Sequence, residues 1–406
     1  SPEVCLDIFW CRSKNDGMER SLFGPLVEDL ADKMVFLSGP RQVGKTTLAR
    51  KVLERQPAET RVYLNWDRAE HRKVMRTLAW PRHGAVVVLD EVHKYARWKT
   101  LVKGFHDTEG HLQRLLVTGS GRLDVFRKGG DSLAGRYHGL RLHPLSVGEV
   151  VRSGGPPDPK LLEQPASWSA RAAAPAEVLP ALLELGGFPE PFLSGSSRTA
   201  GRWRLAHREQ VLRQDLRDLS LVRELSLVEQ LVDLLAERVG GVLSINALRE
   251  DLQVDHGTVS GWIAALERLQ VVFRVPPYAR ALARALRKGT KLYFWDWSEA
   301  PAGGARFENL VAVHLLKLCH WLQDVEGRRV ELHYVRDREQ HEVDFLLVRD
   351  RKPWVLVEAK ASGTSPDRSL GYFRSRLKVP FAFQVVERGE PQRDIVPAAR
   401  LLSALP

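Results

Sequence analysis

Residues Met34–Arg50 read MVFLSGPRQVGKTTLAR, and this stretch decides the fold class. A short apolar run leads into the pattern G-x-x-x-x-G-K-T, from Gly39 to Thr46, and a segment of helical character follows it. Glycines let a loop curl until successive backbone N–H groups surround an anion, and the N-terminus of the next helix adds partial positive charge. The sequence therefore predicts a phosphate-binding loop between a strand and a helix.

Such a loop predicts a site for a nucleoside triphosphate, taken here as ATP, and for Mg²⁺. We expect Lys45 to reach the β- and γ-phosphates and the Thr46 hydroxyl to bind Mg²⁺. An ordinary glycine-rich turn is the alternative, but the strand before the loop and the helix after it favour phosphate binding. The predicted nucleotide contacts are Gly39, Pro40, Arg41, Gln42, Val43, Gly44, Lys45, Thr46 and Thr47.

Two further apolar runs end in polar side chains suited to the same site. The run VVVLDEV begins at Val86 and predicts a buried strand that delivers Asp90 to Mg²⁺ and Glu91 to the attacking water as general base. The run LLVTGS follows, and there Thr118 or Ser120 is expected either to sense the γ-phosphate or to cap the next helix.

An arginine in the segment SLAGRYHGLRLHPL is expected to stabilise charge in the transition state. Arg136 follows Gly135 in a predicted loop, which suits an arginine finger acting within the chain or across a subunit interface. A homo-oligomer is therefore one expectation. Spacing alone leaves Arg122, Arg127 and Arg141 as rivals.

Six segments in a fixed order carry a resemblance to a known family. GPRQVGKTTL, LDEV, TGS, SLAGR, PLSVGE and GGFPEPF resemble the AAA-type ATPases that carry a C-terminal domain of unknown function, DUF4143. The resemblance covers about residues 20–385 and implies an α/β P-loop ATPase domain of the AAA_14 type with ATP and Mg²⁺ as cofactors. It says less about biological role.

Composition bounds the partners. The 406 residues predict two or three domains, and the formal net charge of +11 favours a nucleic-acid partner, although arginines on solvated faces would give the same excess. No apolar run approaches the ~20 residues that span a membrane, and no secretory signal is recognisable. Three cysteines make no disulfide framework, so the sequence predicts a cytoplasmic protein without a membrane partner.

The middle of the chain resembles a winged helix. Two helices are predicted at about 244–252 and 256–269, and a β-like run with a basic loop covers 271–295. Basic side chains in a wing favour phosphate contacts, hence weak sequence specificity. A helical module that packs on the ATPase domain is the alternative. The predicted nucleic-acid contacts are Arg280, Arg284, Arg287, Lys288 and Lys291.

Carboxylates dominate the C-terminal part. Asp344 and Glu358 are predicted on neighbouring strands, with Lys360 on the same strand face as Glu358 and Glu308 on a preceding helix. The spacing D-x13-E-x-K resembles the PD-(D/E)xK nuclease fold, with Val343 in place of the proline. That resemblance implies Asp344 and Glu358 as Mg²⁺ ligands and all four residues as catalytic. A solvent-facing strand with an ion pair is the alternative.

Together these patterns predict an α/β chain with a P-loop AAA-type ATPase domain, a winged-helix-like segment and a restriction-endonuclease-like domain. We expect an ATPase that binds DNA by structure rather than sequence and cleaves or remodels it. The alternative is a nucleotide-dependent switch whose C-terminal domain only binds DNA, RNA or a protein; the AAA-like landmarks disfavour a small-molecule kinase. The predicted segments are 1–19 (irregular), 20–150 (ATPase), 151–240 (linker and helical region), 241–298 (winged-helix-like) and 299–406 (nuclease-like).

Overall fold

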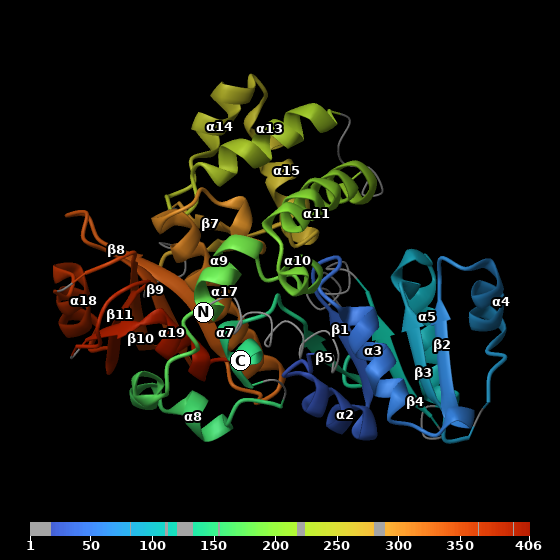
Figure 1. Cartoon of the computed structure of the whole chain (residues 1–406). Coiled ribbons are helices and arrows are strands. Elements are labelled where there is room, and N and C mark those ends of the chain that lie inside the picture. The colour runs from blue at the N-terminus through green and yellow to red at the C-terminus, as the bar shows by residue number, and fades with distance from the viewer. Residues whose placement is uncertain are drawn as a thin grey trace. The chain divides into compact units, whose positions relative to one another are not determined.

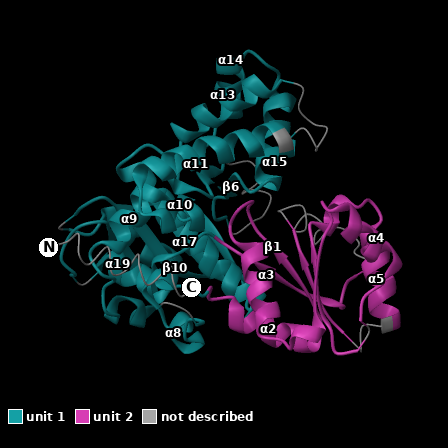
Figure 2. Cartoon of the chain, turned by 45° about the vertical axis from the view of Figure 1, so that its right-hand side comes forward, with its two compact units in different colours: residues 1–19, 144–406 teal, residues 20–143 magenta. Residues whose placement is uncertain are grey.

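The computed structural model describes residues 18–81, 83–109, 113–119, 133–152, 155–216, 224–279, 289–363, 365–392 and 394–406. They form two compact units, one of residues 20–143 and one that holds the rest (Figure 2). No helix within these ranges is long and apolar enough to cross a membrane.

The unit of residues 20–143 is built on a parallel sheet with the strand order β2-β3-β4-β1-β5 (Figure 1). Its strands are β1 (Met34–Ser38), β2 (Arg61–Asn65), β3 (Val86–Asp90), β4 (Arg114–Thr118) and β5 (Tyr137–Arg141). Strands β1 and β3 are buried at every position, as strands covered on both faces must be. The predicted parallel α/β fold is confirmed.

Helices cover both faces of this sheet. Its helices are α2 (Phe23–Asp32), α3 (Lys45–Glu54), α4 (Ala69–Thr77) and α5 (Trp98–Glu109), with short 3₁₀ turns η1 (Ala58–Thr60) and η2 (Val92–Lys94). On one face, Phe36 and Leu89 pack with Met75 of α4 and Trp98 of α5. Helix α2 contacts α3 and the strands β1 and β4, and helix α3 contacts β2, β3 and β4. Side-chain alternation along a strand assigns these two helices to the other face.

The second unit begins with a helical region. Its elements are α7 (Val147–Arg152), α8 (Pro159–Glu163), η4 (Pro165–Ala170), α9 (Val178–Leu185), α10 (Pro189–Ser194), α11 (Ser197–Gln210) and the π-helical turn η5 (Val211–Asp215). Residues 152–180, at the start of the predicted linker and helical region, are rich in Pro and Ala, which is typical of an irregular linker or surface excursion. The described part of it is packed instead, because Leu162 and Trp168 are fully buried and Trp168 contacts the rings of Trp354 and Phe383.

The described residues that follow form helices and a pair of antiparallel strands. They are α13 (Leu225–Ala236), α14 (Ile245–Leu252), α15 (His256–Arg268), β6 (Val272–Val275) and β7 (Lys291–Phe294), and the turn η6 (Trp297–Glu299) comes next. Ser244 and Asp255 cap α14 and α15 through their side chains, which explains where these helices begin. Strands β6 and β7 pair antiparallel. The two helices lie where the sequence predicts them, and the winged-helix interpretation stays a prediction.

The C-terminal part is a mixed sheet with the strand order β12-β11-β10-β9-β8. After α17 (Gly304–Asp324) come β8 (Val330–Arg336), β9 (Glu342–Arg349), β10 (Lys352–Lys360), α18 (Arg368–Leu377), β11 (Phe381–Val386), β12 (Ile395–Pro397), α19 (Ala398–Leu401) and η7 (Leu402–Ala404). Strands β8, β9 and β10 pair antiparallel, whereas β10, β11 and β12 pair parallel. The β10–β11 register sets Glu358 opposite Gln384.

Candidate functional site

The predicted phosphate loop connects β1 to α3. Gly44 precedes the helix with φ +102°, a left-handed backbone conformation that residues other than glycine rarely adopt. At Gly39, a Cβ atom would collide with the carbonyl oxygen of Leu142. Lys45 is buried, and its Nζ donates to the carbonyl oxygens of Gly39 (2.9 Å) and Pro40 (2.6 Å). The lysine is therefore held over the loop that it is expected to serve.

Asp90 lies at the carboxyl end of β3 and is 2% exposed. One carboxylate oxygen accepts from the Thr46 hydroxyl at 2.9 Å and from the Tyr63 hydroxyl at 2.6 Å. Thr118 of β4 donates to the other oxygen. Burial and this carboxylate raise the pKa of Tyr63, so its hydroxyl keeps the proton that it donates. Thr46 and Asp90, predicted as Mg²⁺ ligands, thus meet.

This arrangement fits a magnesium ion. Hydroxyl and carboxylate oxygens are the donors that Mg²⁺ prefers, and Thr46 and Asp90 supply one of each, side by side. The side chains that donate to Asp90 are neutral, so its negative charge is available to a cation.

Glu91 follows Asp90 and has φ +58°, an uncommon conformation for a residue with a side chain. Backbone strain of this kind costs free energy and tends to occur at functional sites. The carboxylate is 26% exposed and lies 3.3 Å from Nζ of Lys94, which itself pairs with Asp67 at 2.7 Å. The geometry leaves Glu91 accessible beside the Asp90 site.

Arg136 immediately precedes β5 and pairs with Asp107 of α5, with 2.7 Å between Nε and Oδ1. The pair lowers the pKa of Asp107 and raises that of Arg136, mainly through the hydrogen bond between them. The arginine is therefore held within its own unit in this conformation. Ser120 and the rival arginines Arg122 and Arg127 lie outside the described residues.

The C-terminal acids converge as the sequence predicts. The backbone N–H of Asp344 on β9 donates to Oε2 of Glu358 on β10 at 3.1 Å, and Ala359 N–H donates to Oδ2 of Asp344 at 3.1 Å. Nζ of Lys360 lies 2.7 Å from Oε1 of Glu358. The side-chain amide of Gln384 bonds the backbone of Asp367 and Ser365 rather than the acids.

Lys291 of β7 is the counter-charge of this cluster. Its Nζ lies 3.0 Å from Oδ1 of Asp344, 2.8 Å from Oε1 of Glu342 and 3.5 Å from Oε1 of Glu308, and the side chain is 1% exposed. Burial alone would lower the pKa of Lys291, but Asp344, Glu308 and Glu342 raise it well above its ordinary value. The lysine was predicted to contact nucleic acid from a basic wing, and its burial excludes it from such a surface in this conformation.

Burial also acts on the acids. Burial and the charge of Asp344 raise the pKa of Glu308 to about 7 and that of Glu358 to about 7. Glu308 further accepts a hydrogen bond from the Tyr293 hydroxyl at 2.7 Å. As they stand, these carboxylates do not fit a metal ion, because the ammonium of Lys291 lies between Asp344 and Glu308.

The other predicted nucleic-acid contacts, Arg280, Arg284, Arg287 and Lys288, lie outside the described residues.

The arginine-rich helix α11 and the turn after it are partly salt-bridged. Arg208 pairs with Asp233 at 2.6 Å, and Arg213 pairs with Glu229 at 3.2 Å and with Glu209 at 3.4 Å. These pairs indicate a solvated, salt-bridged face there.

Family comparisons agree with the geometry. Residues 31–151 match the AAA domain (AAA_14), residues 176–302 match a domain of unknown function (DUF8612), and residues 303–398 match another (DUF4143). The chain carries an AAA domain and a DUF4143 domain. The AAA match covers the phosphate loop, Asp90 and Glu91, which supports an ATPase site there.

Individual relatives add little about role. Uncharacterized proteins of Mycobacterium bovis and Mycobacterium tuberculosis are each 26% identical over 263 residues, which is 65% of this chain and 54% of theirs. The chain thus spans about half the length of the curated relatives it matches. A Thermotoga maritima RuvB Holliday junction branch migration motor has 17% identity and a TM-score of 0.31 over 64% of this chain and 90% of its own. A STAND protein of Pyrococcus horikoshii has 12% identity and a TM-score of 0.26, covering 72% of this chain and 44% of its own. With TM-scores this low, neither structure indicates a role for this chain.

Sequence reasoning missed several residues of both sites. In the AAA domain, Tyr63 and Asn65 of β2 donate to Asp90, and Arg20 donates to the carbonyl oxygen of Val43 in the phosphate loop at 2.9 Å. Asn65 has a usable signal, because it ends an apolar strand whose register sets it opposite Asp90. In the DUF4143 region, Glu342 was missed.

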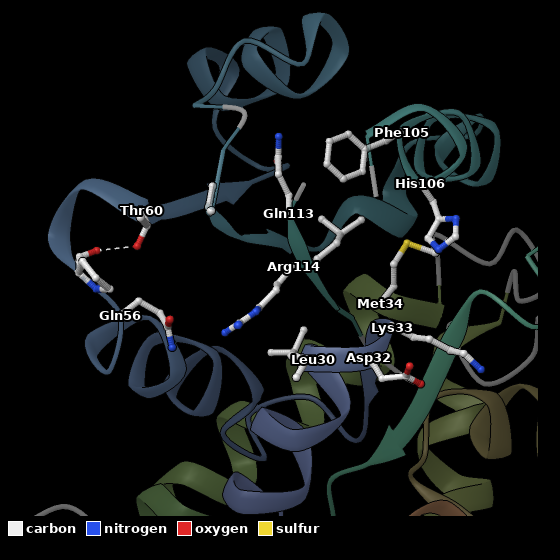
Figure 3. A pocket seen from close by; sticks show the side chains of 15 residues that line it. Leu30, Asp32, Lys33, Met34, Gln56, Thr60, Phe105, His106, Gln113 and Arg114 are labelled. Atoms are coloured by element: carbon white, nitrogen blue, oxygen red, sulfur yellow. Dashed lines mark hydrogen bonds between the residues drawn. The ribbon is translucent and has the colours of Figure 1, made fainter. Parts of the chain in front are cut away.

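A separate cavity of about 490 Å³ lies at the end of the AAA sheet where the strands begin (Figure 3). It is lined at the starting ends of β1 and β4, by Met34 and Arg114 among others, and the Arg114 side chain extends toward Gln56. The phosphate loop follows the opposite end of β1, so this cavity is not the nucleotide site.

Proposed function

We propose that the AAA domain binds and hydrolyses Mg-ATP. The observation that carries the proposal is the contact between the Thr46 hydroxyl and the buried, otherwise neutral-partnered carboxylate of Asp90, directly beside Lys45. A phosphate loop, a magnesium-ligand pair and an accessible glutamate are the parts that phosphoryl transfer to water requires.

Each residue has a defined task in this proposal. Backbone N–H groups of the loop and the N-terminus of α3 bind the phosphates, and Lys45 exchanges its two carbonyl partners for phosphate oxygens. Thr46 and Asp90 hold Mg²⁺, which neutralises charge on the phosphates when bound. Glu91 orients the attacking water and accepts its proton. Arg136, once released from Asp107, is our candidate for the finger.

The test is ATP hydrolysis by the purified chain with Mg²⁺. Lys45→Ala should abolish hydrolysis and weaken nucleotide binding, whereas Glu91→Gln should abolish hydrolysis and leave binding intact. Lys73→Ala, on the exposed surface of α4, is the matched control and should behave like the wild type. Equal hydrolysis by wild type and Lys45→Ala would refute the assignment.

We further propose that nucleic acid, with DNA favoured, is the partner of this ATPase. The support is the net charge of +11 and the basic segment of residues 280–288. Binding of fluorescent duplex, branched and single-stranded DNA should weaken steeply with salt. Replacing Arg284, Arg287 and Lys288 by alanine should reduce both affinity and salt slope, whereas the salt-bridged Arg213→Ala should change neither. Unaltered binding by the triple variant would exclude this basic segment as a contact with DNA.

Oligomerisation belongs to the same proposal. If Arg136 acts across an interface, hydrolysis per chain rises with protein concentration, and Arg136→Ala removes that rise. Light scattering at the same concentrations checks the assembly. Concentration-independent hydrolysis in both proteins would exclude a finger in trans.

Metal-assisted cleavage by the DUF4143 region is the second candidate, and non-cleaving binding by a nucleotide-dependent switch is its rival. The convergence of Glu308, Asp344, Glu358 and Lys360 supports cleavage, whereas the buried Lys291 supports the rival. DNA substrates with Mg²⁺ decide between them. Cleavage lost in Asp344→Asn but kept in Lys45→Ala supports a nuclease, and intact substrates under all conditions support the switch.

A further inference from the structure

We infer that Lys291, paired with Glu308, Glu342 and Asp344, is an internal cation that takes the place of a divalent metal ion at Asp344, and that a metal ion binds there only when this lysine is withdrawn. The inference rests on the second candidate function in one respect, since it concerns the regulation of the same carboxylate site.

The position of the ammonium is the first argument. Nζ of Lys291 lies within 3.0 Å of Asp344 and Glu342 and 3.5 Å from Glu308. An ammonium offers three donors and one compact charge, which matches three carboxylates. At 1% exposure the lysine is shielded from water and salt. It performs the task that a bound cation would perform, holding acids together.

The remaining carboxylate oxygens are the second argument. Oδ2 of Asp344 accepts from Ala359 N–H, while Oε1 and Oε2 of Glu358 face Lys360 and Asp344 N–H. Every oxygen of this acid pair therefore has a protein donor. A divalent ion bound to Oδ1 of Asp344 would lie only about 4 Å from the Lys291 ammonium, where like charges repel strongly in a buried site. Lysine and metal ion exclude each other.

The attachment of β7 is the third argument. Lys291 pairs through its backbone with Val275 of β6 and bridges to Val242, and Tyr293 on the same strand holds Glu308. Gly240 completes this cover: it has φ +78°, and a Cβ atom there would lie 2.7 Å from the Glu308 carboxylate oxygens. A shift of β7 would therefore move Lys291 and Tyr293 together, which links strands β6 and β7 to the acids.

Mn²⁺ binding to the full chain without nucleotide, measured by calorimetry or electron paramagnetic resonance, tests the inference. Lys291→Met should bind Mn²⁺ at least about tenfold more tightly than the wild type, and adding Asp344→Asn should remove the gain. Lys352→Met, which deletes an exposed lysine at the start of β10 and outside the cluster, is the matched control and should not produce it. The Asp344→Asn background also subtracts any Mn²⁺ held at Asp90.

Since Lys291→Met leaves buried carboxylates uncompensated, a second variant combines Lys291→Gln with Glu342→Gln to lower the remaining charge, and the same gain is expected. Equal Mn²⁺ affinity of wild type and variants would overturn the inference while leaving the metal site intact. No Asp344-dependent Mn²⁺ binding in any variant would overturn both the inference and metal-assisted cleavage, and leave the ATPase proposal untouched.

Discussion

Two buried aspartates, each at the centre of a cluster, have different kinds of hydrogen-bond partner. Asp90 in the AAA domain accepts hydrogen bonds from Thr46, Tyr63, Asn65 and Thr118, all neutral. Asp344 in the DUF4143 region faces the ammonium of Lys291. Neutral donors orient a carboxylate and leave its charge for an incoming cation, whereas a buried ammonium satisfies that charge in advance. The presence of a buried aspartate in the sequence therefore does not tell whether its charge is available to a metal ion or is already neutralised by a lysine.

The comparison is tested most strongly at Lys291. Lys291→Met should lower the free energy of unfolding of its unit by about 3–5 kcal/mol, because it strands buried carboxylates without a counter-charge. Lys360→Met removes a lysine that is 42% exposed and should cost less, about 1–2 kcal/mol, although its partner Glu358 is buried. Urea unfolding followed by tryptophan fluorescence measures both. Similar losses of unfolding free energy for the two variants would show that Lys291 stabilises the buried acids no more than a half-exposed lysine does. The contrast between Asp344 and Asp90 would then fail.

The converse test lies at Asp90. Asp90→Asn keeps the shape and one of the two acceptor oxygens but removes the charge, so Mg-ATP hydrolysis should fall by at least about 100-fold. The AAA domain should lose only about 1 kcal/mol of stability, because one hydrogen bond to the lost oxygen is affected and the donors to Asp90 are neutral. Asp344→Asn should destabilise its unit more, because Lys291 loses a charged partner. Steady-state kinetics and thermal unfolding distinguish the two, and an equally large loss of stability in Asp90→Asn would break the contrast.

The pH dependence of stability sharpens the picture of the compensated cluster. The folded-state pKa of Glu358 is about 7, above its ordinary value of 4.5, because of burial and Asp344. The folded state therefore binds more protons than the unfolded state between these values, and stability should fall as pH rises from 5 to 8, by about 2 kcal/mol from this residue. Glu358→Gln should flatten the profile, which denaturant unfolding at several pH values measures. An unchanged slope would contradict the assignment.

The smallest expected effect concerns one neutral donor of Asp90. Tyr63→Phe removes a single hydrogen bond and should cost about 1 kcal/mol of stability, with a fall in hydrolysis of no more than about tenfold. The loss should be partial because Thr46, Asn65 and Thr118 still orient the carboxylate. Initial rates at saturating Mg-ATP measure the effect. A loss as large as that of Asp90→Asn would show that Tyr63 acts in the reaction itself.

The AAA sheet could be predicted from the sequence because its determinants are local. Continuous apolar runs such as Val86–Asp90 fit strands buried on both faces, and the glycines of the phosphate loop fix the backbone between a strand and a helix. Asp344 and Glu358 could be paired for a similar reason, since neighbouring strands bring them together. Their partner Lys291, in contrast, comes from a strand of another sheet and could not be paired with them from the sequence.

Lys291 could not be predicted correctly because its surroundings are tertiary. In the sequence it follows the basic run RKGT and reads as one more exposed cation. In the structure all four residues of β7 are buried, and three acids from α17 and β9 lie around the lysine. The burial of Trp168 could not be predicted for the same reason. Its Pro- and Ala-rich neighbours in the sequence indicate a linker, whereas the aromatic rings that bury it come from distant strands.

The close approach of Gly240 to Glu308 carries an evolutionary consequence. A glycine at this position and a lysine at position 291 serve one closed arrangement, so selection should act on them jointly. Among homologues, those that lose the lysine should also tolerate larger residues at position 240, and those that keep it should keep the glycine. Covariation of these two positions would then separate members with an open acid cluster from members whose cluster is sealed.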